Sequence, residues 1–205
     1  MPSRIGVFGG TFDPVHLGHL LVAEQCREQA ALDRVRFIPA ARPPHKQGRT
    51  ISPMAQRVEM LALALAGQPA FCVDDLEKDR PGPSFTADTL AVLHEHFPDA
   101  HLLLIIGSDC LPDLVSWREP ARIGQLAKLL VVSRPGWEVR PGEPIPASWN
   151  VPPGIEVEQV IQSPLVDISS HDLRRRVSLG KSLRYMVPAA VACYIEAHGL
   201  YRVPA

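Results

Sequence analysis

The stretch GVFGGTFDPVHLGHL, residues 6–20, begins as a buried β-strand and ends as the start of a helix. Its apolar part ends in Gly9 and Gly10, which let a backbone approach a ligand without a Cβ in the way. His16 and His19 follow three residues apart, so in a helix that starts just before them both imidazoles project from the first turn. The unpaired N–H groups and positive dipole end of such a helix favour phosphate. The stretch therefore predicts a phosphate-binding turn in which each histidine can donate an N–H to a phosphate oxygen.

Short apolar runs alternate with longer amphipathic stretches along the rest of the chain. The apolar runs predict buried strands at residues 4–9, 34–40, 70–75, 101–107 and 127–133, and the amphipathic stretches predict helices at residues 16–32, 52–67, 84–97, 169–180 and 187–199. Strands that are hydrophobic throughout belong to sheets covered on both faces, and βαβα order implies parallel strands joined by right-handed crossovers. We predict an α/β fold with a Rossmann-like, doubly wound parallel sheet of five to six strands, in three α/β/α layers with C-terminal helices, forming one domain over residues 1–205.

Local signals predict several helix ends. Ser52 is the expected N-cap of the second helix, with Pro53 at its first position and Gly67 as its stop. Ser84 or Thr86 is expected to cap the third helix.

A proline-rich segment, residues 134–164, interrupts the alternation, and only residues 155–161 within it are predicted as a strand. Such a long segment is either a functional flap or a stiffened surface excursion, and we favour the second interpretation.

Composition excludes several classes of protein. Lys and Arg total 21 against 22 Asp and Glu, so no overall field attracts a nucleic acid or a membrane surface. The cysteines Cys26, Cys72, Cys110 and Cys193 form no C-x-x-C pair, and buried, reduced thiols are expected. The chain shows neither the signal-peptide pattern nor an apolar run long enough to span a membrane. We expect a cytoplasmic protein without nucleic-acid or membrane partners; a homodimer is compatible with the sequence.

Competing interpretations of the first turn lose support from its residues. The stretch has no Gly-Lys-Ser/Thr of a Walker loop and no G-x-G-x-x-G, and no acidic residue ends the second strand to hold a ribose. A metal site on His16 and His19 lacks a matching Cys, Asp or Glu, so no metal ligands are assigned. A purely structural role for either histidine is the remaining alternative. It has less weight here because both histidines follow a Gly-Gly turn.

The motifs resemble those of a known superfamily. GGTFDPVHLGHL resembles the signature of the nucleotidylyltransferases, a glycine-containing turn followed by Phe-Asp-Pro and H-x-G-H. Within the superfamily, the chain is most similar to the bacterial nicotinate mononucleotide adenylyltransferases. Four further stretches match that group, in the same order along the chain: PPHK (43–46), GPSFTADTL (82–90), IIGSD (105–109) with Trp117 downstream, and ISSHDLR (168–174). The resemblance covers essentially the whole chain, with one departure: His171 and Leu173 stand where the family usually has Thr and Ile.

The resemblance implies a reaction in which the 5′-phosphate of nicotinate mononucleotide attacks the α-phosphorus of ATP. The implied catalytic residues are His16, His19 and Arg174. The implied ATP contacts are Gly9, Gly10, Thr11, Phe12, His16, His19, Gly107, Ser108, Ser169, Ser170 and Arg174, and the implied mononucleotide contacts are His45, Lys46, Thr86, Asp109 and Trp117. Mg²⁺ is expected to enter on the ATP phosphates. Ser169 with Asp172 also has the spacing of a capping box, so this helix start would be a second phosphate site.

Two alternatives remain beside this reading. One is another nucleotidylyltransferase, acting on pantetheine phosphate or a polyol phosphate, against which Trp117 and GPSFTADTL argue. The other is a non-catalytic nucleotide sensor on the same fold, which should have lost an H-x-G-H histidine, whereas both are present here.

Overall fold

A computed structural model of the chain describes residues 2–43, 51–134, 136–137, 139 and 143–202. Within these residues the strands are β1 (Arg4–Gly10), β2 (Arg34–Pro39), β3 (Phe71–Val73), β4 (His101–Gly107), β5 (Lys128–Val132) and β6 (Val157–Ile161). The helices are α1 (Leu17–Gln29), α2 (Met54–Leu65), α3 (Thr86–His96), α4 (Pro120–Leu126), α5 (Ser170–Ser178) and α6 (Ala189–Ala197). None of the helices in these ranges is long and apolar enough to cross a membrane.

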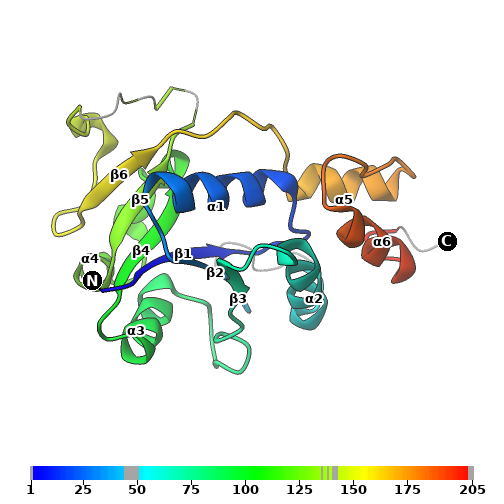
Figure 1. The fold of residues 1–205 in the computed structure, drawn as a ribbon, viewed down its shortest axis with the longest axis horizontal. Coiled ribbons are helices and arrows are strands. Elements are labelled where there is room, and N and C mark those ends of the chain that lie inside the picture. The colour runs from blue at the N-terminus through cyan, green and yellow to red at the C-terminus, as the bar shows by residue number, and fades with distance from the viewer. Residues whose placement is uncertain (1, 44–50, 135, 138, 140–142, 203–205) are drawn as a thin grey trace.

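The strands form one parallel sheet with the order β3-β2-β1-β4-β5-β6, which confirms the predicted doubly wound α/β fold (Figure 1). Side chains alternate between its faces, as Leu103 and Ile105 of β4 pack with α1, α2, α5 and α6, while Leu104 and Ile106 pack with α3 and α4. Each strand is therefore apolar throughout because both of its faces are covered.

The carboxyl ends of β1 and β4 diverge, and this divergence creates the space for a ligand. The two strands pair only as far as Val7 and Leu104. Beyond that point β1 continues along β2 to Gly10, and β4 continues along β5 to Gly107. A crevice of this kind, where the strand order reverses, is where doubly wound sheets bind ligands.

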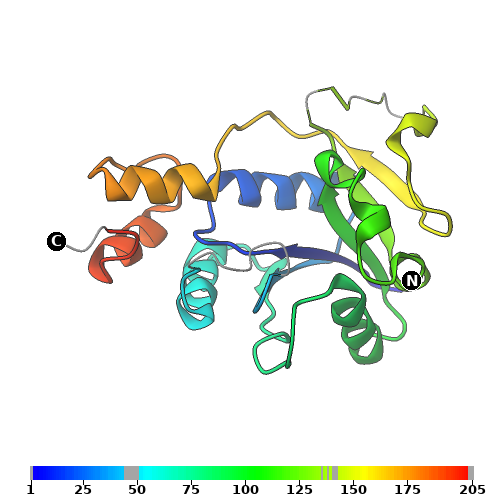
Figure 2. The same ribbon diagram turned by 180° about the vertical axis from the view of Figure 1, so that it is seen from behind.

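The C-terminal helices lie together at one end of the molecule, beyond the first turn of α1 (Figures 1 and 2). The segment between β6 and α5, residues 162–169, runs along α1 to reach them. This path brings the start of α5 beside the start of α1, where the Ser170 hydroxyl donates to the Pro14 carbonyl at 2.9 Å.

Several predicted helix ends are wrong because contacts from elsewhere in the fold replace the expected caps. Pro53 is the N-cap of α2, and the Ser52 backbone instead meets Asp13 and Arg57. Phe85 precedes α3 without a side-chain cap, since the Ser84 hydroxyl accepts the Arg42 N–H.

Two other predictions of helix ends are confirmed. Gly67 follows α2 with a φ of +91°, a conformation that suits glycine. Ser169 caps α5 by accepting the Asp172 N–H at 3.1 Å.

The short helix α4 was not predicted, because its seven residues give no clear period and include Gly124. A Cβ at Gly124 would collide with the Gly154 carbonyl, so a close backbone approach explains this glycine.

The proline-rich segment is more than the surface excursion that we favoured, because part of it packs into the core and its two ends line a cavity. Trp149 is buried against the α3 and α4 side of the core, and its ring meets Trp137 edge to face at 5.4 Å. Arg134 and Pro164, at the ends of the segment, line a cavity of about 410 Å³ that is described below.

Candidate active site

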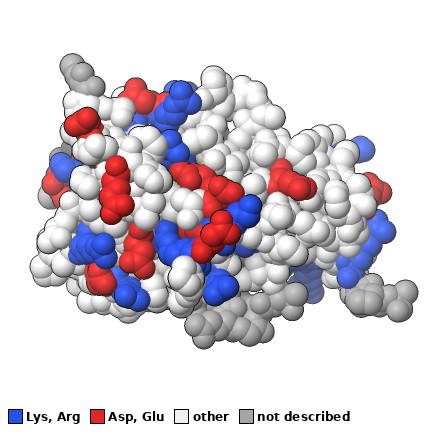
Figure 3. All heavy atoms as spheres, turned by 90° about the horizontal axis from the view of Figure 1, so that it is seen from below, with Lys and Arg blue, Asp and Glu red and all other residues white. Residues whose placement is uncertain are grey.

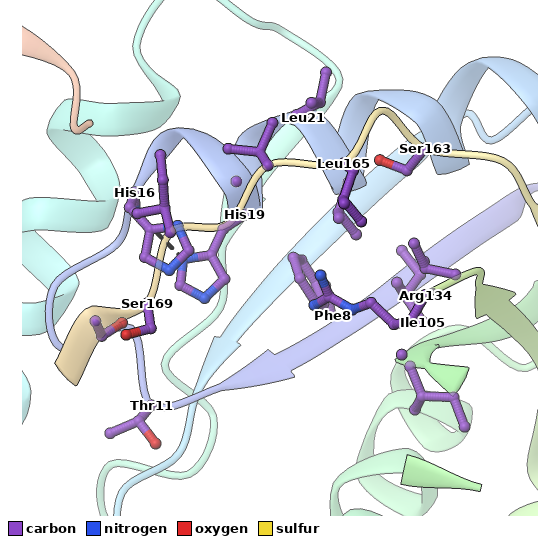
Figure 4. Close-up of a pocket in the computed structure, with 18 of the residues that line it drawn as sticks. Phe8, Thr11, His16, His19, Leu21, Ile105, Arg134, Ser163, Leu165 and Ser169 are labelled. Carbon is purple, nitrogen blue, oxygen red and sulfur yellow. Dashed lines mark hydrogen bonds between the residues drawn. The ribbon is translucent and has the colours of Figure 1, made fainter. Parts of the chain in front are cut away.

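A cavity of about 410 Å³ opens at the divergence of β1 and β4, and we call it the nucleotide cavity after the ligand that the sequence resemblance implies for it. Its walls come from the turn after β1, the start of α1, the ends of β4 and β5, residues 163–168 and the start of α5 (Figure 4). It collects seven of the predicted site residues: Thr11, His16, His19, Gly107, Ser169, Ser170 and Arg174. The stretch after β1 and the ISSHDLR stretch, which are distant in sequence, therefore share one cavity.

A second cavity, of about 130 Å³, lies on the other side of the same divergence, and we call it the small cavity. Ile105 and Ile106 border both cavities. Its walls include four further predicted residues: Gly9, Gly10, Thr86 and Trp117. The two cavities divide these eleven residues into two groups, one on each side of the β1–β4 divergence.

The histidine pair is preorganised at the start of α1, although the helix begins one residue later than expected. His16 is the N-cap rather than a first-turn residue. The His16 and His19 rings nevertheless stack, with centroids 3.6 Å apart (Figure 4). The His16 backbone N–H donates to His19 Nδ1 at 3.2 Å, so the neutral His19 ring carries its proton on Nε2. This hydrogen bond fixes which nitrogen of His19 can donate.

His16 is neutral at physiological pH. Burial, with a smaller contribution from the positive charge of Arg134, lowers the pKa of His16 to about 4. Its Nδ1 is buried without a hydrogen-bond partner among the described residues. An unpaired buried nitrogen is costly and is typical of a group that waits for a ligand or water.

We expect the low pKa of His16 to make the protein less stable in mild acid. The unfolded chain takes up the His16 proton near pH 6.5, and the folded chain does so only near pH 4. Stability is therefore lost as the pH falls through this window, by about 3 kcal/mol in full. Denaturant unfolding at pH 7 and pH 4.5 should show a smaller loss for His16→Gln than for the unsubstituted chain. Equal losses in the two proteins would contradict this assignment.

Three predicted ATP contacts are placed differently from expectation. Phe12 is 1% exposed and has a φ of +49°, so its side chain lies in the core beneath the turn. A Cβ on Gly10 would lie 2.8 Å from the Phe12 ring, whereas one on Gly9 would meet nothing within 4 Å. Gly10 is thus required by Phe12 packing, and Gly9 retains the open backbone that was expected at this turn. Ser108 is fully buried and borders neither cavity. Its hydroxyl accepts the Arg134 backbone N–H at 3.1 Å, so Ser108 positions Arg134 instead of contacting a ligand.

The remaining mononucleotide contacts divide as follows. Asp109 is exposed, borders neither cavity, and forms an ion pair with Arg134 at 3.8 Å. His45 and Lys46 lie outside the described residues. Trp117 is half-buried and packs against the core, so the core interpretation and the binding interpretation both fit its position.

Sequence reasoning missed Arg134, Leu165 and Glu77, each of which borders a cavity. Arg134 lies at the far end of the nucleotide cavity from the histidines, close to Ile105 (Figure 4). Arg134 comes just after the end of β5, as Asp109 comes just after the end of β4. The expectation that ligands bind beyond the carboxyl ends of the strands, which selected Asp109, would therefore also have selected Arg134. No sequence signal marks Leu165, which sits in an irregular segment, or Glu77, which is buried in the small cavity and accepts from Thr89 and the Ala41 N–H.

The residues around the nucleotide cavity suit an anionic ligand. Two helix starts, α1 and α5, meet there with Arg174 and Arg134, which together favour negative charge. No group of three or more His, Cys, Asp and Glu side chains that could hold a metal occurs in the described parts of the chain. We therefore assign no protein ligands to a metal.

Known proteins are similar to this chain over most of its length. Residues 7–176 match the cytidylyltransferase-like family. The chain is 48% identical over 200 residues to a protein of Thermomicrobium roseum named probable nicotinate-nucleotide adenylyltransferase, covering 98% of this chain and 92% of the relative. It is also 48% identical over 199 residues to a Thermus thermophilus protein of the same name, covering 97% of this chain and all of the relative.

Solved structures show the same fold at low sequence identity. The nicotinic acid mononucleotide adenylyltransferase of Plasmodium falciparum, complexed with NaAD, superposes with a TM-score of 0.78 at 17% identity over 97% of both chains. A putative nicotinate-nucleotide adenylyltransferase from Vibrio parahaemolyticus gives a TM-score of 0.70 at 18% identity, over 98% of this chain and 97% of the other. The chain belongs to the cytidylyltransferase-like family of nucleotidylyltransferases, in the group of the nicotinate-nucleotide adenylyltransferases.

Proposed function

We propose that this protein transfers AMP from ATP to nicotinate mononucleotide, giving nicotinate adenine dinucleotide and pyrophosphate. The observation that carries the proposal is the meeting of His16, His19, two helix starts and Arg174 in one cavity at the β1–β4 divergence. The names of the relatives at 48% identity support the same substrate. Residues 1–205 are treated as a single nucleotidylyltransferase domain.

The two cavities suggest how the substrates are divided. The triphosphate would lie at the His16, Thr11 and Ser169 end of the nucleotide cavity, and the adenine would lie toward Ile105, Leu165 and Arg134 (Figure 4). The pyridine ring would enter the small cavity against Trp117. There the start of α3, near Thr86, offers unpaired N–H groups to the nicotinate carboxylate, which favours the acid over the amide.

The chemistry needs alignment and charge stabilisation rather than a general base. The 5′-phosphate has a second pKa near 6 and is ionised at neutral pH. One of its oxygens bonds to the α-phosphorus of ATP while the bond from that phosphorus to the bridging oxygen of the β-phosphate breaks, and pyrophosphate carries away the electron pair. His19 Nε2–H, Arg174 and the start of α5 would neutralise the charge that builds on the phosphoryl oxygens. ATP would arrive with Mg²⁺ on its phosphates as part of the substrate.

A pyrophosphate-release assay tests the proposal directly. We expect release with ATP and nicotinate mononucleotide, less with nicotinamide mononucleotide, and none above background with pantetheine phosphate. Preferred use of pantetheine phosphate would overturn the assigned substrate. ATP binding without release from any acceptor would indicate a nucleotide sensor instead.

Trp117→Ala tests the assignment of the small cavity. We expect the KM for nicotinate mononucleotide to rise about fivefold, because an aromatic stack contributes on the order of 1 kcal/mol beyond burial. The KM for ATP should stay within about twofold, and Trp117→Phe should recover part of the loss. Steady-state kinetics with each substrate varied in turn separates the two values. An equal rise in both would place Trp117 in the core alone.

The distribution of surface charge bears on the kind of partner that this protein has. Acidic and basic side chains are intermingled over the face seen in Figure 3, where no continuous basic surface suggests a nucleic-acid partner. A cytoplasmic location and a homodimer stay predictions.

A further inference from the structure

The turn between β1 and α1 is held by side chains from distant parts of the chain. Arg57 of α2 donates to the Thr11 carbonyl at 2.9 Å, and Arg174 of α5 donates to the Asp13 carbonyl at 2.6 Å. The Ser170 hydroxyl binds the Pro14 carbonyl in the same way. Donors on these carbonyl oxygens offset partial negative charge that would otherwise face an incoming phosphate.

The Asp13 side chain presents a further problem for a site that binds polyanions. Asp13 borders the nucleotide cavity and is 2% exposed. A buried carboxylate in this position must be bound by donors, or it repels the triphosphate and destabilises the fold. The Ser52 N–H provides one donor at 3.2 Å.

Tyr201, close to the C-terminal end of the chain, provides the second donor. Its hydroxyl donates to Asp13 Oδ1 at 2.7 Å, across 188 residues of sequence. Its ring packs against the core formed with α2 and α6. Burial, and the hydrogen bond to Asp13, raise the pKa of Tyr201, so the phenol keeps its proton and remains a donor.

We propose that Tyr201 is a positioning residue for adenylyl transfer, whose hydroxyl holds Asp13 and thereby keeps residues 11–16 in the geometry that sets His16 and His19 against the nucleotide. The C-terminal end of the chain is in this way part of the nucleotide site, although Tyr201 itself does not border the cavity. The inference deepens the proposed function and rests on it for the identity of the reaction. The nucleotide affinity can be measured without that assumption.

Tyr201→Phe removes only the hydroxyl, and Tyr194→Phe is its matched control. Tyr194 lies on α6 and donates to the Glu59 carboxylate of α2, so its hydroxyl also joins the C-terminal region to α2 but does not contact the turn. We expect Tyr201→Phe to lower kcat by about 10-fold to 100-fold, since a small misalignment of reacting groups has effects of this size. Tyr194→Phe should keep kcat and the KM for ATP within about twofold.

A calorimetric titration with a non-hydrolysable ATP analogue provides the second readout. We expect the Kd to rise about tenfold for Tyr201→Phe and to stay unchanged for Tyr194→Phe. If the unsubstituted chain failed to use nicotinate mononucleotide, the proposed function would fall, while the titration would still judge the role of Tyr201.

A double variant tests whether Tyr201 acts through Asp13. Asp13→Ala removes the oxygen that accepts the Tyr201 hydrogen bond. Adding Tyr201→Phe to Asp13→Ala should therefore cause little further loss of affinity, because both changes break the same interaction. Additive losses would overturn the proposal, as would normal kcat and Kd in Tyr201→Phe. The proposal would also fall if both tyrosine variants lost activity in parallel with their thermal stability.

Discussion

His19→Ala is expected to lower kcat by about 10²-fold to 10³-fold, the usual cost of removing one donor that stabilises transition-state charge. The effect should be large because the His16 backbone N–H occupies His19 Nδ1 and leaves the proton on Nε2. The loss should appear mainly in kcat, since an interaction that strengthens in the transition state contributes less to ground-state binding.

Steady-state pyrophosphate release, with thermal unfolding measured in parallel, checks this prediction. His101→Ala is a suitable control, because His101 is exposed and begins β4, at the opposite end of the strand from both cavities. The fold of His19→Ala should survive, since the lost hydrogen bond to His16 contributes about 1 kcal/mol. A kcat near that of the unsubstituted chain would show that His19 has no part in catalysis.

Arg174→Ala is expected to lower kcat/KM about 100-fold or more through two losses. The guanidinium borders the nucleotide cavity, where it can bind phosphate oxygens, and it also holds the Asp13 carbonyl at 2.6 Å. Lysine keeps the charge but lacks the planar fork that reaches two acceptors at once, so Arg174→Lys should recover only a small part of the activity.

The next residue on the helix provides the matched control. Arg175 is exposed and lies outside the nucleotide cavity, because consecutive residues of a helix point about 100° apart. Arg175→Ala should therefore keep kcat/KM within about twofold. If Arg175→Ala were as damaging as Arg174→Ala, general positive charge would explain the effect and the specific contact would not.

Local sequence patterns were sufficient for the framework of the fold. The strands of the sheet, from Arg4–Gly10 to Val157–Ile161, were predicted because burial on both faces leaves a run of apolar residues that is visible in sequence. Errors occurred where a tertiary contact replaced a local one, as at Ser52 and Ser84, whose expected capping positions are filled by Pro53 and Phe85. Helix α4 was missed because a seven-residue helix buries too little surface to leave a period.

The candidate site was predicted only in part, for a related reason. His16 and His19 are recognisable because they lie three positions apart at the start of a helix, and Ser169 is recognisable because its capping partner Asp172 is equally close. Leu165 and Glu77 carry no such local mark, since both lie in irregular segments, whereas Arg134 could have been found from its position after a strand, as Asp109 was.

The sequence by itself determined the parallel sheet and the family, because each strand and each family motif is a pattern of residues close to one another along the chain. On the same ground it predicted a phosphate-binding turn. Only the tertiary structure decided that the predicted contacts divide between two cavities and that Gly10 serves the Phe12 ring. It alone also joined Tyr201 to Asp13 across 188 residues. The physical reason is that periodicity and spacing report which residues are buried together locally, whereas a contact between distant segments exists only after the sheet and the helices have brought them together.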